Sequence, residues 1–302
     1  MSAPAVATVP ERATISEADS EAPREARVEA AGITDIGRHR STNEDAFLIG
    51  TLQRSINVHA ASPGARGWFP GEPVGTLFIV ADGMGGQGGG DAASSTAVNA
   101  VTNYLLNGMP WVKVEANGTP HPASRTSVRR ELSTAISAGE QTVRAEGAHT
   151  GRPHMGTTLT MALVLWPFVY VAHVGDTRCY LLESGQLRCL TIDHNLAQKF
   201  VEASPEPIEP PERFQHILWN ALGAGIERAV PQIGKFQITS GAVLLVCSDG
   251  LNKHVPDETI KTVLSSDDSC ANRASQLVDL ANAAGGTDNI TVLVAEVVAE
   301  AT

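Results

Sequence analysis

Residues 78–95, FIVADGMGGQGGGDAASS, decide how the chain folds and which chemistry it can support. The run LFIVA over residues 77–81 is short and apolar, which is typical of a buried strand, and it ends at the acid Asp82. Six glycines follow within residues 83–90, before a segment of small residues that we expect to be helical. Glycine lets a backbone come close to a neighbour, so Gly83 could offer its carbonyl to a ligand of Asp82.

Four other places in the chain put acids where a buried strand meets a turn. These acids are Glu44 and Asp45 together, Asp176, Asp249 and Asp288. The strand ends of one sandwich can converge, so we expect the carboxylates to gather in one cleft. Clustered carboxylates stay ionised only when positive charge lies among them, and an oxygen-only ligand set favours Mg²⁺ or Mn²⁺.

Two other interpretations of the glycine-rich segment are weaker. A plain glycine turn explains the glycines but not the acids placed alike elsewhere. A phosphate-binding P-loop would close with Lys followed by Ser or Thr, which this segment lacks, and it would not begin with an acid that repels phosphate. A metal site at Asp82 is therefore favoured.

Composition limits the class of protein. The 302 residues are 42% apolar, enough for one large domain or two small ones, and the formal net charge is −11. That charge argues against nucleic acid or an anionic membrane as the main partner, and no apolar run reaches the roughly 20 residues of a membrane span. Residues 1–27 have no secretory-signal pattern and read as a disordered tail. The four cysteines form no CxxC pair, which favours reduced thiols in a cytoplasmic protein.

Hydrophobic patterns predict an α+β fold of layered sheets and helices. Strands are expected at residues 28–36, 46–49, 77–81, 158–165, 169–174, 179–182, 187–191, 243–247 and 290–298. Helices are expected at residues 91–106, 126–146, 194–203, 212–222, 256–264 and 270–284. Tight connections at residues 166–167 and 184–185 predict hairpins, and residues 53–75, 107–124 and 202–212 are expected to be surface loops.

Seven short motifs follow one another along the chain: RSTNEDA (40–46), DGMGG (82–86), MGTT (155–158), GDTR (175–178), TIDH (191–194), SDGL (248–251) and DNIT (288–291). Any one of them is a weak signal, but together and in this order they resemble the bacterial-type members of the type-2C (PPM) metal-dependent serine/threonine protein phosphatases. The resemblance covers about residues 28–299, so residues 28–302 are expected to form one phosphatase domain.

The resemblance implies a four-layer αββα sandwich, with two central antiparallel sheets flanked by helix pairs. It also implies a binuclear Mn²⁺ or Mg²⁺ centre whose bridging hydroxide attacks the phosphorus of phosphoserine or phosphothreonine. By match to the motifs, the metal ligands are Asp45, Asp82, Gly83 through its carbonyl, Asp249 and Asp288, with Glu44 acting through water. Arg40 matches the arginine that grips the substrate phosphate, which a planar guanidinium can do in two-pronged fashion.

Two positions depart from the family pattern. Asp176 and a second acid would hold a loose third metal, but the second position here is Lys253. A cation at this position should weaken or abolish that third site. Two placements of Lys253 are open: it forms a salt bridge with Asp176 and stands in for the metal, or it points to solvent. Met84 stands where many eukaryotic relatives have a histidine proposed as general acid; water, His39 or His194 could protonate the leaving group instead.

We therefore expect a phosphoprotein phosphatase that reverses the action of a cognate serine/threonine kinase. Two alternatives stay open at this point. A regulatory pseudophosphatase would keep the fold but turn over weakly or not at all because of Lys253, and a small-molecule phosphomonoesterase would use the same two-metal chemistry on metabolites. The sequence does not choose between Mg²⁺ and Mn²⁺.

Overall fold

The computed structural model describes residues 26–57, 68–85, 89–108, 122–204 and 208–299. Residues 1–25 of the expected tail lie outside the described residues, and so does most of the expected loop at residues 107–124. The first described strand begins at Ala26, so residues 26 and 27 belong to a strand rather than to the tail.

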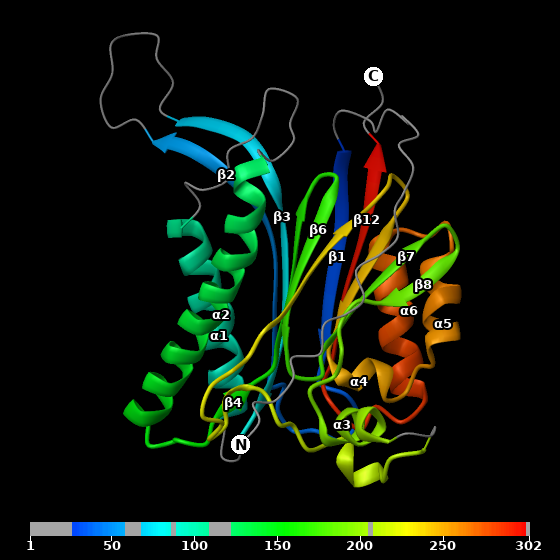
Figure 1. The fold of residues 1–302 in the computed structure, drawn as a ribbon. Coiled ribbons are helices and arrows are strands. Elements are labelled where there is room, and N and C mark those ends of the chain that lie inside the picture. Colours follow the sequence, from blue (N-terminus) through cyan, green and yellow to red (C-terminus); the bar gives the residue numbers. More distant parts are fainter. Residues whose placement is uncertain (1–25, 58–67, 86–88, 109–121, 205–207, 300–302) are drawn as a thin grey trace.

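The described chain forms two antiparallel sheets between two layers of helices (Figure 1). The strands of the first sheet are β2 (Asp45–Asn57), β3 (Trp68–Met84), β4 (Gly156–Thr157), β5 (Leu159–Leu165), β6 (Phe168–Val174), β9 (Leu222–Gly223) and β10 (Gln232–Gln237). They are ordered β10-β6-β5-β3-β4-β9, with β2 also paired to β3. The strands of the second sheet are β1 (Ala26–Asp35), β7 (Arg178–Glu183), β8 (Gln186–Cys189), β11 (Val243–Cys247) and β12 (Ile290–Ala299). Their order is β1-β12-β11-β7-β8.

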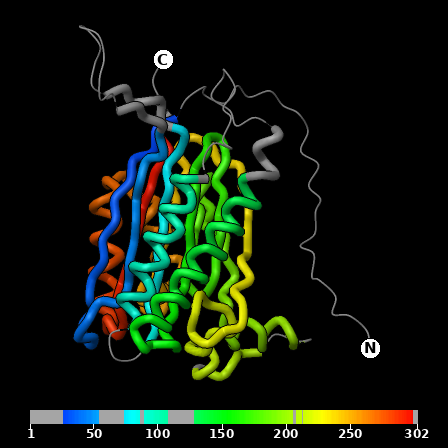
Figure 2. Tube along the Cα trace, turned by 90° about the vertical axis from the view of Figure 1, so that its left-hand side faces the viewer, coloured from blue at the N-terminus to red at the C-terminus, as the bar shows by residue number. Residues whose placement is uncertain are grey.

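Each sheet is covered on its outer face by helices. Helices α1 (Gly90–Gly108) and α2 (Pro122–His149) pack on the first sheet, and Figure 2 views the molecule from their side. Helices α5 (Asp257–Leu264) and α6 (Cys270–Ala283) pack on the second sheet, next to the short α4 (Asp249–Asn252). Helix α3 (Leu196–Ala203) lies at the lower end of the molecule in Figure 1. The predicted αββα sandwich is confirmed.

Burial on both faces explains why the central strands are apolar throughout instead of alternating. In β3, Leu77, Ile79 and Ala81 pack toward α1 and α2, whereas Phe78 and Val80 pack between the two sheets. Every residue of β5 and of β11 is buried. Because successive side chains of a strand point to opposite faces, only a strand with both faces covered buries all of them.

The hairpin predicted at residues 184–185 is confirmed between β7 and β8. Ser184 and Gly185 both have positive φ, 51° and 72°, as a two-residue turn with the right twist requires. The connection predicted at residues 166–167 joins β5 to β6.

Some element predictions were wrong. Residues 53–75 were expected to form a loop, but β2 continues to Asn57 and β3 starts at Trp68, so their described parts form a two-stranded ribbon. The prolines of this ribbon lie beyond the residues of β3 that pair with β5, and its register shifts between Leu52 and Ser55. Proline is tolerated there because one edge of the strand is free.

The helix expected at residues 212–222 is also wrong. Only a single 3-10 turn, Glu212–Phe214, forms, and it is followed by a turn, an isolated bridge between Leu218 and Asn195, and a bend. Leu196 donates a backbone hydrogen bond to Ile217, and Trp219 donates one to His194. These bonds satisfy the backbone without a helix. Strand β10, with its many polar residues, was not predicted.

None of the described helices is long and apolar enough to cross a membrane. All four cysteines are free thiols, as expected.

Candidate active site

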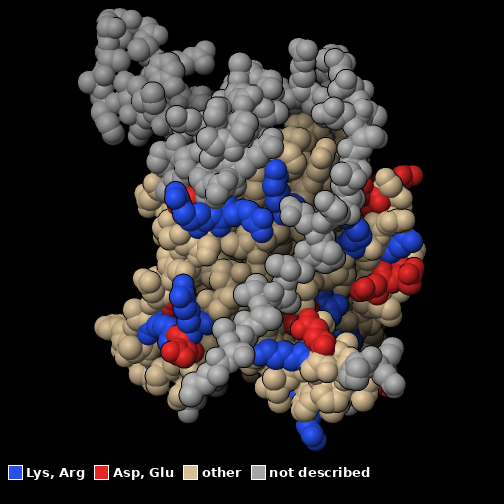
Figure 3. Space-filling view, in the orientation of Figure 1, with Lys and Arg blue, Asp and Glu red and all other residues tan. Residues whose placement is uncertain are grey.

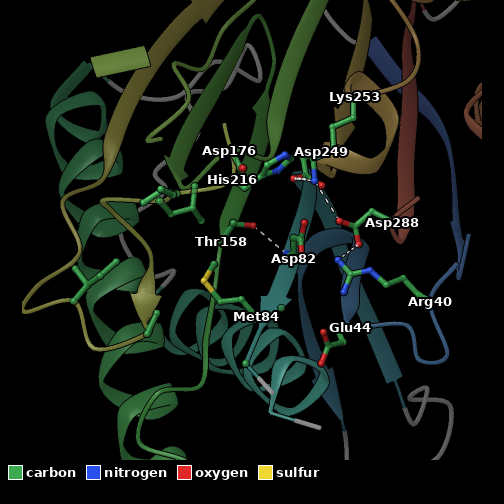
Figure 4. A pocket seen from close by; sticks show the side chains of 16 residues that line it. Arg40, Glu44, Asp82, Met84, Thr158, Asp176, His216, Asp249, Lys253 and Asp288 are labelled. Atoms are coloured by element: carbon green, nitrogen blue, oxygen red, sulfur yellow. Dashed lines mark hydrogen bonds and ion pairs between the residues drawn. The ribbon is translucent and has the colours of Figure 1, made fainter. Parts of the chain in front are cut away.

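A cleft of about 700 Å³ opens at one end of the sandwich, where β3, β11 and β12 meet the loops that precede or follow them (Figure 4). Seven of the predicted site residues line it: Arg40, Glu44, Asp82, Gly83, Asp176, Asp249 and Asp288. Lys253 and Met84 line it too. Asp45 is not among the lining residues, but it is the partner of Asp82 across the β2–β3 pair.

Asp45 is held by hydroxyl groups from the other sheet. Its Oδ2 accepts hydrogen bonds from Ser248 Oγ and Thr291 Oγ1, both at 2.7 Å. Its Oδ1 is buried and has no hydrogen-bond partner among the described residues. One oxygen is thus fixed in position while the other is free to bind a cation, since a buried carboxylate oxygen without a partner is costly.

Asp82 ends the buried part of β3 and is fixed through its backbone. Its N–H donates to Thr158 Oγ1 at 3.0 Å, and its carbonyl accepts from Thr157 Oγ1 at 2.9 Å. These bonds use main-chain atoms only, so the Asp82 carboxylate stays available to the cleft (Figure 4).

The glycines after Asp82 are required by close backbone packing. A Cβ on Gly83 would lie 2.1 Å from the carbonyl oxygen of Gly90 and 2.6 Å from that of Glu44. A Cβ on Gly90 would lie 2.6 Å from Glu44 Oε1. Any side chain at these positions would push apart the two segments that flank the cleft.

Asp249 and Asp288 are joined by cationic side chains. Arg40 Nη2 lies 2.7 Å from Asp288 Oδ1. Lys253 Nζ lies 2.5 Å from Asp249 Oδ2 and 3.2 Å from Asp288 Oδ2. Both expectations for Lys253 were wrong: it neither pairs with Asp176 nor points to solvent. Lys253 follows Asp249 by one helical turn, and this spacing brings its side chain back to the carboxylate.

The electrostatics of the cleft show an excess of negative charge. Burial raises the pKa of Asp45 to about 7, and it raises the pKa of Asp82 and Asp176 well above the usual value, with repulsion between the carboxylates adding to it. Burial also raises the pKa of Asp249, against the pull of Lys253. Asp288 is the exception: burial would raise its pKa, but Lys253 and Arg40 outweigh this and lower it.

These observations fit divalent cations. Asp45 Oδ1 and Asp249 Oδ1 are buried oxygens without partners, and the carboxylates around them are destabilised in their charged form. An all-oxygen set of this kind suits Mg²⁺ or Mn²⁺. Within the described ranges, no three His, Cys, Asp or Glu side chains are grouped closely enough to hold one ion. Two of the carboxylates, those of Asp249 and Asp288, form ion pairs with Lys253 instead.

Sequence reasoning missed residues that shape the cleft. Asn289 fastens the loop that carries Arg40 and Glu44: its Oδ1 accepts from the Glu44 N–H at 2.8 Å, and its Nδ2 donates to the carbonyls of Ile36 and Thr42. Its place inside the DNIT motif was the available signal. His216 lines the cleft from the segment before β9. No pattern in the sequence indicated that it belongs to the site.

The two histidines considered as proton donors are not among the residues that line the cleft. His194 is buried, and its Nδ1 accepts hydrogen bonds from the Gly175 N–H at 3.1 Å and from Asn220 Nδ2 at 2.9 Å. Burial lowers its pKa to about 4. His194 therefore holds the turn before Asp176 in place as a neutral ring.

Several known proteins are similar to this chain in sequence. The family model described as protein phosphatase 2C matches residues 69–285. The chain is 34% identical over 267 residues to the serine/threonine phosphatase stp of Listeria welshimeri, covering 87% of this chain and 93% of the relative. It is 29% identical to the protein phosphatase PhpP of Streptococcus pneumoniae over 88% of this chain and 96% of that one.

Solved structures give the same result. The serine/threonine phosphatase PstP/Ppp of Mycobacterium tuberculosis superposes with a TM-score of 0.68 at 28% identity, over 89% of this chain and 98% of that chain. The catalytic domain of PstP in complex with two manganese ions superposes with a TM-score of 0.68 at 27% identity, over 91% of this chain and 100% of that chain.

Proposed function

The chain belongs to the protein phosphatase 2C family and is a metal-dependent serine/threonine protein phosphatase, and we propose that the cleft around Asp82 is its active site. The observation that carries this proposal is the group of carboxylates of Asp82, Asp176, Asp249 and Asp288 along one cleft, with unpartnered oxygens on Asp45 and Asp249.

We propose two Mn²⁺ or Mg²⁺ ions as cofactors. Asp45, Asp82, the Gly83 carbonyl, Asp249 and Asp288 would hold them, with Glu44 acting through water. The positive charge of Lys253 disfavours a weak third site at Asp176. The structure of a relative in complex with two manganese ions supports this count. Divalent ions at such a site supply an acidified water and positive charge for the phosphoryl oxygens.

The side chains of this protein would prepare the reaction in defined ways. The Arg40 guanidinium lies at the cleft with one nitrogen on Asp288, which orients its other donors for two-pronged binding of a phosphate. Ser248 and Thr291 fix one oxygen of Asp45, so the carboxylate does not need to reorganise during the reaction.

The substrate would be phosphoserine or phosphothreonine in a protein, placed there by a cognate kinase. Residues 216–218 and Ile226 form one wall of the cleft, and Ile217 is 44% exposed, so the wall offers apolar surface to a peptide next to the phosphate. The formal net charge of −11 disfavours nucleic acid as the main partner, and basic and acidic side chains are mixed on the lower half of the face in Figure 3, whereas a band of Lys and Arg crosses its upper half. The free thiols support a reducing compartment, the cytoplasm.

A pseudophosphatase is the second candidate, because the ion pairs of Lys253 engage two proposed metal ligands. The complete set of acids favours an active enzyme over this alternative. A small-molecule phosphomonoesterase has no specific observation in its favour.

Hydrolysis of p-nitrophenyl phosphate tests the proposal. We expect turnover that needs Mn²⁺ or Mg²⁺, is removed by chelation and is lost in Asp249→Asn, because the amide cannot replace a charged ligand. A phosphothreonine peptide assayed in parallel tests the substrate class. Turnover without metal, or an unaffected variant, would refute the proposed site.

A further inference from the structure

We propose that Lys253 is a built-in cation that neutralises Asp249 and Asp288 in the metal-free protein and competes with one divalent ion for these two carboxylates. This inference rests on the proposed function, since it assumes that the cleft binds metal. It makes Lys253 a residue that sets metal affinity rather than one that contacts the substrate.

The position of Lys253 follows from the local backbone. Helix α4 begins at Asp249, and the Lys253 N–H donates to the Asp249 carbonyl at 2.9 Å. This bond fixes Lys253 one turn beyond Asp249. The ammonium group lies between two carboxylates, at 2.5 Å from Asp249 Oδ2 and 3.2 Å from Asp288 Oδ2 (Figure 4).

The environment makes these contacts strong. The Lys253 side chain is 22% exposed, and those of Asp249 and Asp288 are 13% and 18% exposed. At such sites ion pairs are little screened by solvent, and an unpaired carboxylate is costly. When no metal is bound, Lys253 is therefore the cation that pairs with Asp249, and it shares Asp288 with Arg40.

A divalent ion and an ammonium group compete for the same two carboxylates, because two cations so close together repel each other. An ion held by Asp249 and Asp288 has to displace Lys253 Nζ from Oδ2 of both, or accept a like charge a few ångströms away. Either effect subtracts from the binding free energy of that ion. The ion held by Asp45 and Asp82 is not opposed in this way, because no ion pair engages these two acids among the described residues.

A second carboxylate, that of Asp176, lies near the ammonium group of Lys253. Asp176 is 8% exposed and has no ion-pair partner in the described part of the chain. Asp176 and Lys253 both line the cleft, and both also line a neighbouring cavity of about 320 Å³. Lys253 can thus turn toward Asp176 when an ion takes its place, which would leave Asp176 unable to hold a third ion.

Calorimetric titration of the metal-free protein with Mn²⁺ tests the competition. We expect wild type to bind one ion more weakly than the other, and Lys253→Met to bind the weaker ion about tenfold more tightly or better. Lys261→Met is the matched control, because Lys261 lies on α5 and does not line the cleft; its titration should match wild type. Equal weak-site affinities in wild type and Lys253→Met would overturn the inference.

Thermal unfolding gives a readout that is independent of activity. In EDTA we expect Lys253→Met to melt below wild type, because Asp249 loses its cation and Asp288 keeps only its ion pair with Arg40; at saturating Mn²⁺ the difference should vanish or reverse. If Lys253→Met lowers the melting temperature by the same amount in EDTA and at saturating Mn²⁺, Lys253 only supports the fold. If Lys253→Met does not fold, Lys253→Gln takes its place in both measurements. If wild type binds no Mn²⁺, the proposed function and the inference are both overturned. If wild type binds Mn²⁺ and Lys253→Met binds it with the same affinities, only the inference is overturned.

Discussion

Asp45 and Asp82 are register partners across the β2–β3 pair, so two carboxylates that are 37 positions apart in the chain point from neighbouring strands to the same face. Hydroxyl groups of Ser248, directly after β11, and of Thr291, in β12, fix Asp45 from the second sheet. The site therefore joins the two sheets at one end, and its charge should affect the stability of the whole sandwich.

The metal-free protein should lose stability as the pH rises toward neutrality. The pKa of Asp45 is raised to about 7 in the folded protein, so between about pH 4 and pH 7 the carboxyl is protonated when folded and ionised when unfolded. The unfolded state then binds fewer protons, and each pH unit removes up to about 1.4 kcal/mol of unfolding free energy. Urea unfolding in EDTA at pH 5 and pH 7 measures this loss.

Asp45→Asn is the control for that measurement. The amide oxygen can still accept from Ser248 and Thr291, but it cannot ionise, so the variant should lose less stability than wild type between the two pH values. Burial and the charge of Asp45 together raise the pKa of Asp82, so removing that charge lowers the pKa of Asp82 and reduces the loss in the variant further. Equal losses in wild type and variant would show that Asp45 does not titrate in this range.

Gly83→Ala should destabilise the protein and weaken Mn²⁺ binding. The new methyl group would overlap the backbone oxygens of Gly90 and Glu44, so two segments of the cleft must move apart, at a cost of about 1–3 kcal/mol. Gly50→Ala is the control in the same sheet, because its Cβ would meet only the Leu48 side chain, at an ordinary 3.4 Å. Urea unfolding and Mn²⁺ titration of both variants check the expectation, and a neutral Gly83→Ala would contradict it.

The sequence predicted the layers of the fold because buried strands carry a strong local signal. Residues 243–247 were predicted as a strand with the observed bounds, since both faces of β11 are covered. Acids at strand ends marked the cleft for a similar reason. Lys253 was mispredicted because no helix was predicted at residues 249–252, and only a helix there turns the spacing of four residues into a contact with Asp249. The segment around His216 was mispredicted because its backbone bonds go to residues 194–196, and only the tertiary fold brings these together.

Arg40→Ala should weaken substrate binding more than metal binding. Arg40 lines the cleft and is 48% exposed in its ion pair with Asp288, so its removal costs a phosphate-binding group rather than a buried contact. We expect KM for p-nitrophenyl phosphate to rise about tenfold or more, with partial rescue in Arg40→Lys, which keeps the charge but not the two-pronged geometry. Arg38→Ala is the control, because Arg38 instead donates to the Asn282 carbonyl. An unchanged KM in Arg40→Ala would remove Arg40 from the site.

Arg178→Met should destabilise the lining of the cavity that neighbours the cleft. Arg178 donates to both oxygens of Asp193, at 2.9 and 2.7 Å, and to the Tyr180 hydroxyl at 2.9 Å. The Asp193 side chain is 13% exposed, so its loss of a partner should cost about 2–4 kcal/mol in urea unfolding. Arg188 on β8 offers a contrast: its nitrogen lies 3.7 Å from Glu183 and its side chain is 50% exposed, so Arg188→Met should cost less than about 1 kcal/mol. Since Arg178 lies two residues after Asp176, the first variant should also disturb the turn that holds that carboxylate. Equal costs for the two arginines would show that the pair with Asp193 is as well screened by solvent as a surface pair.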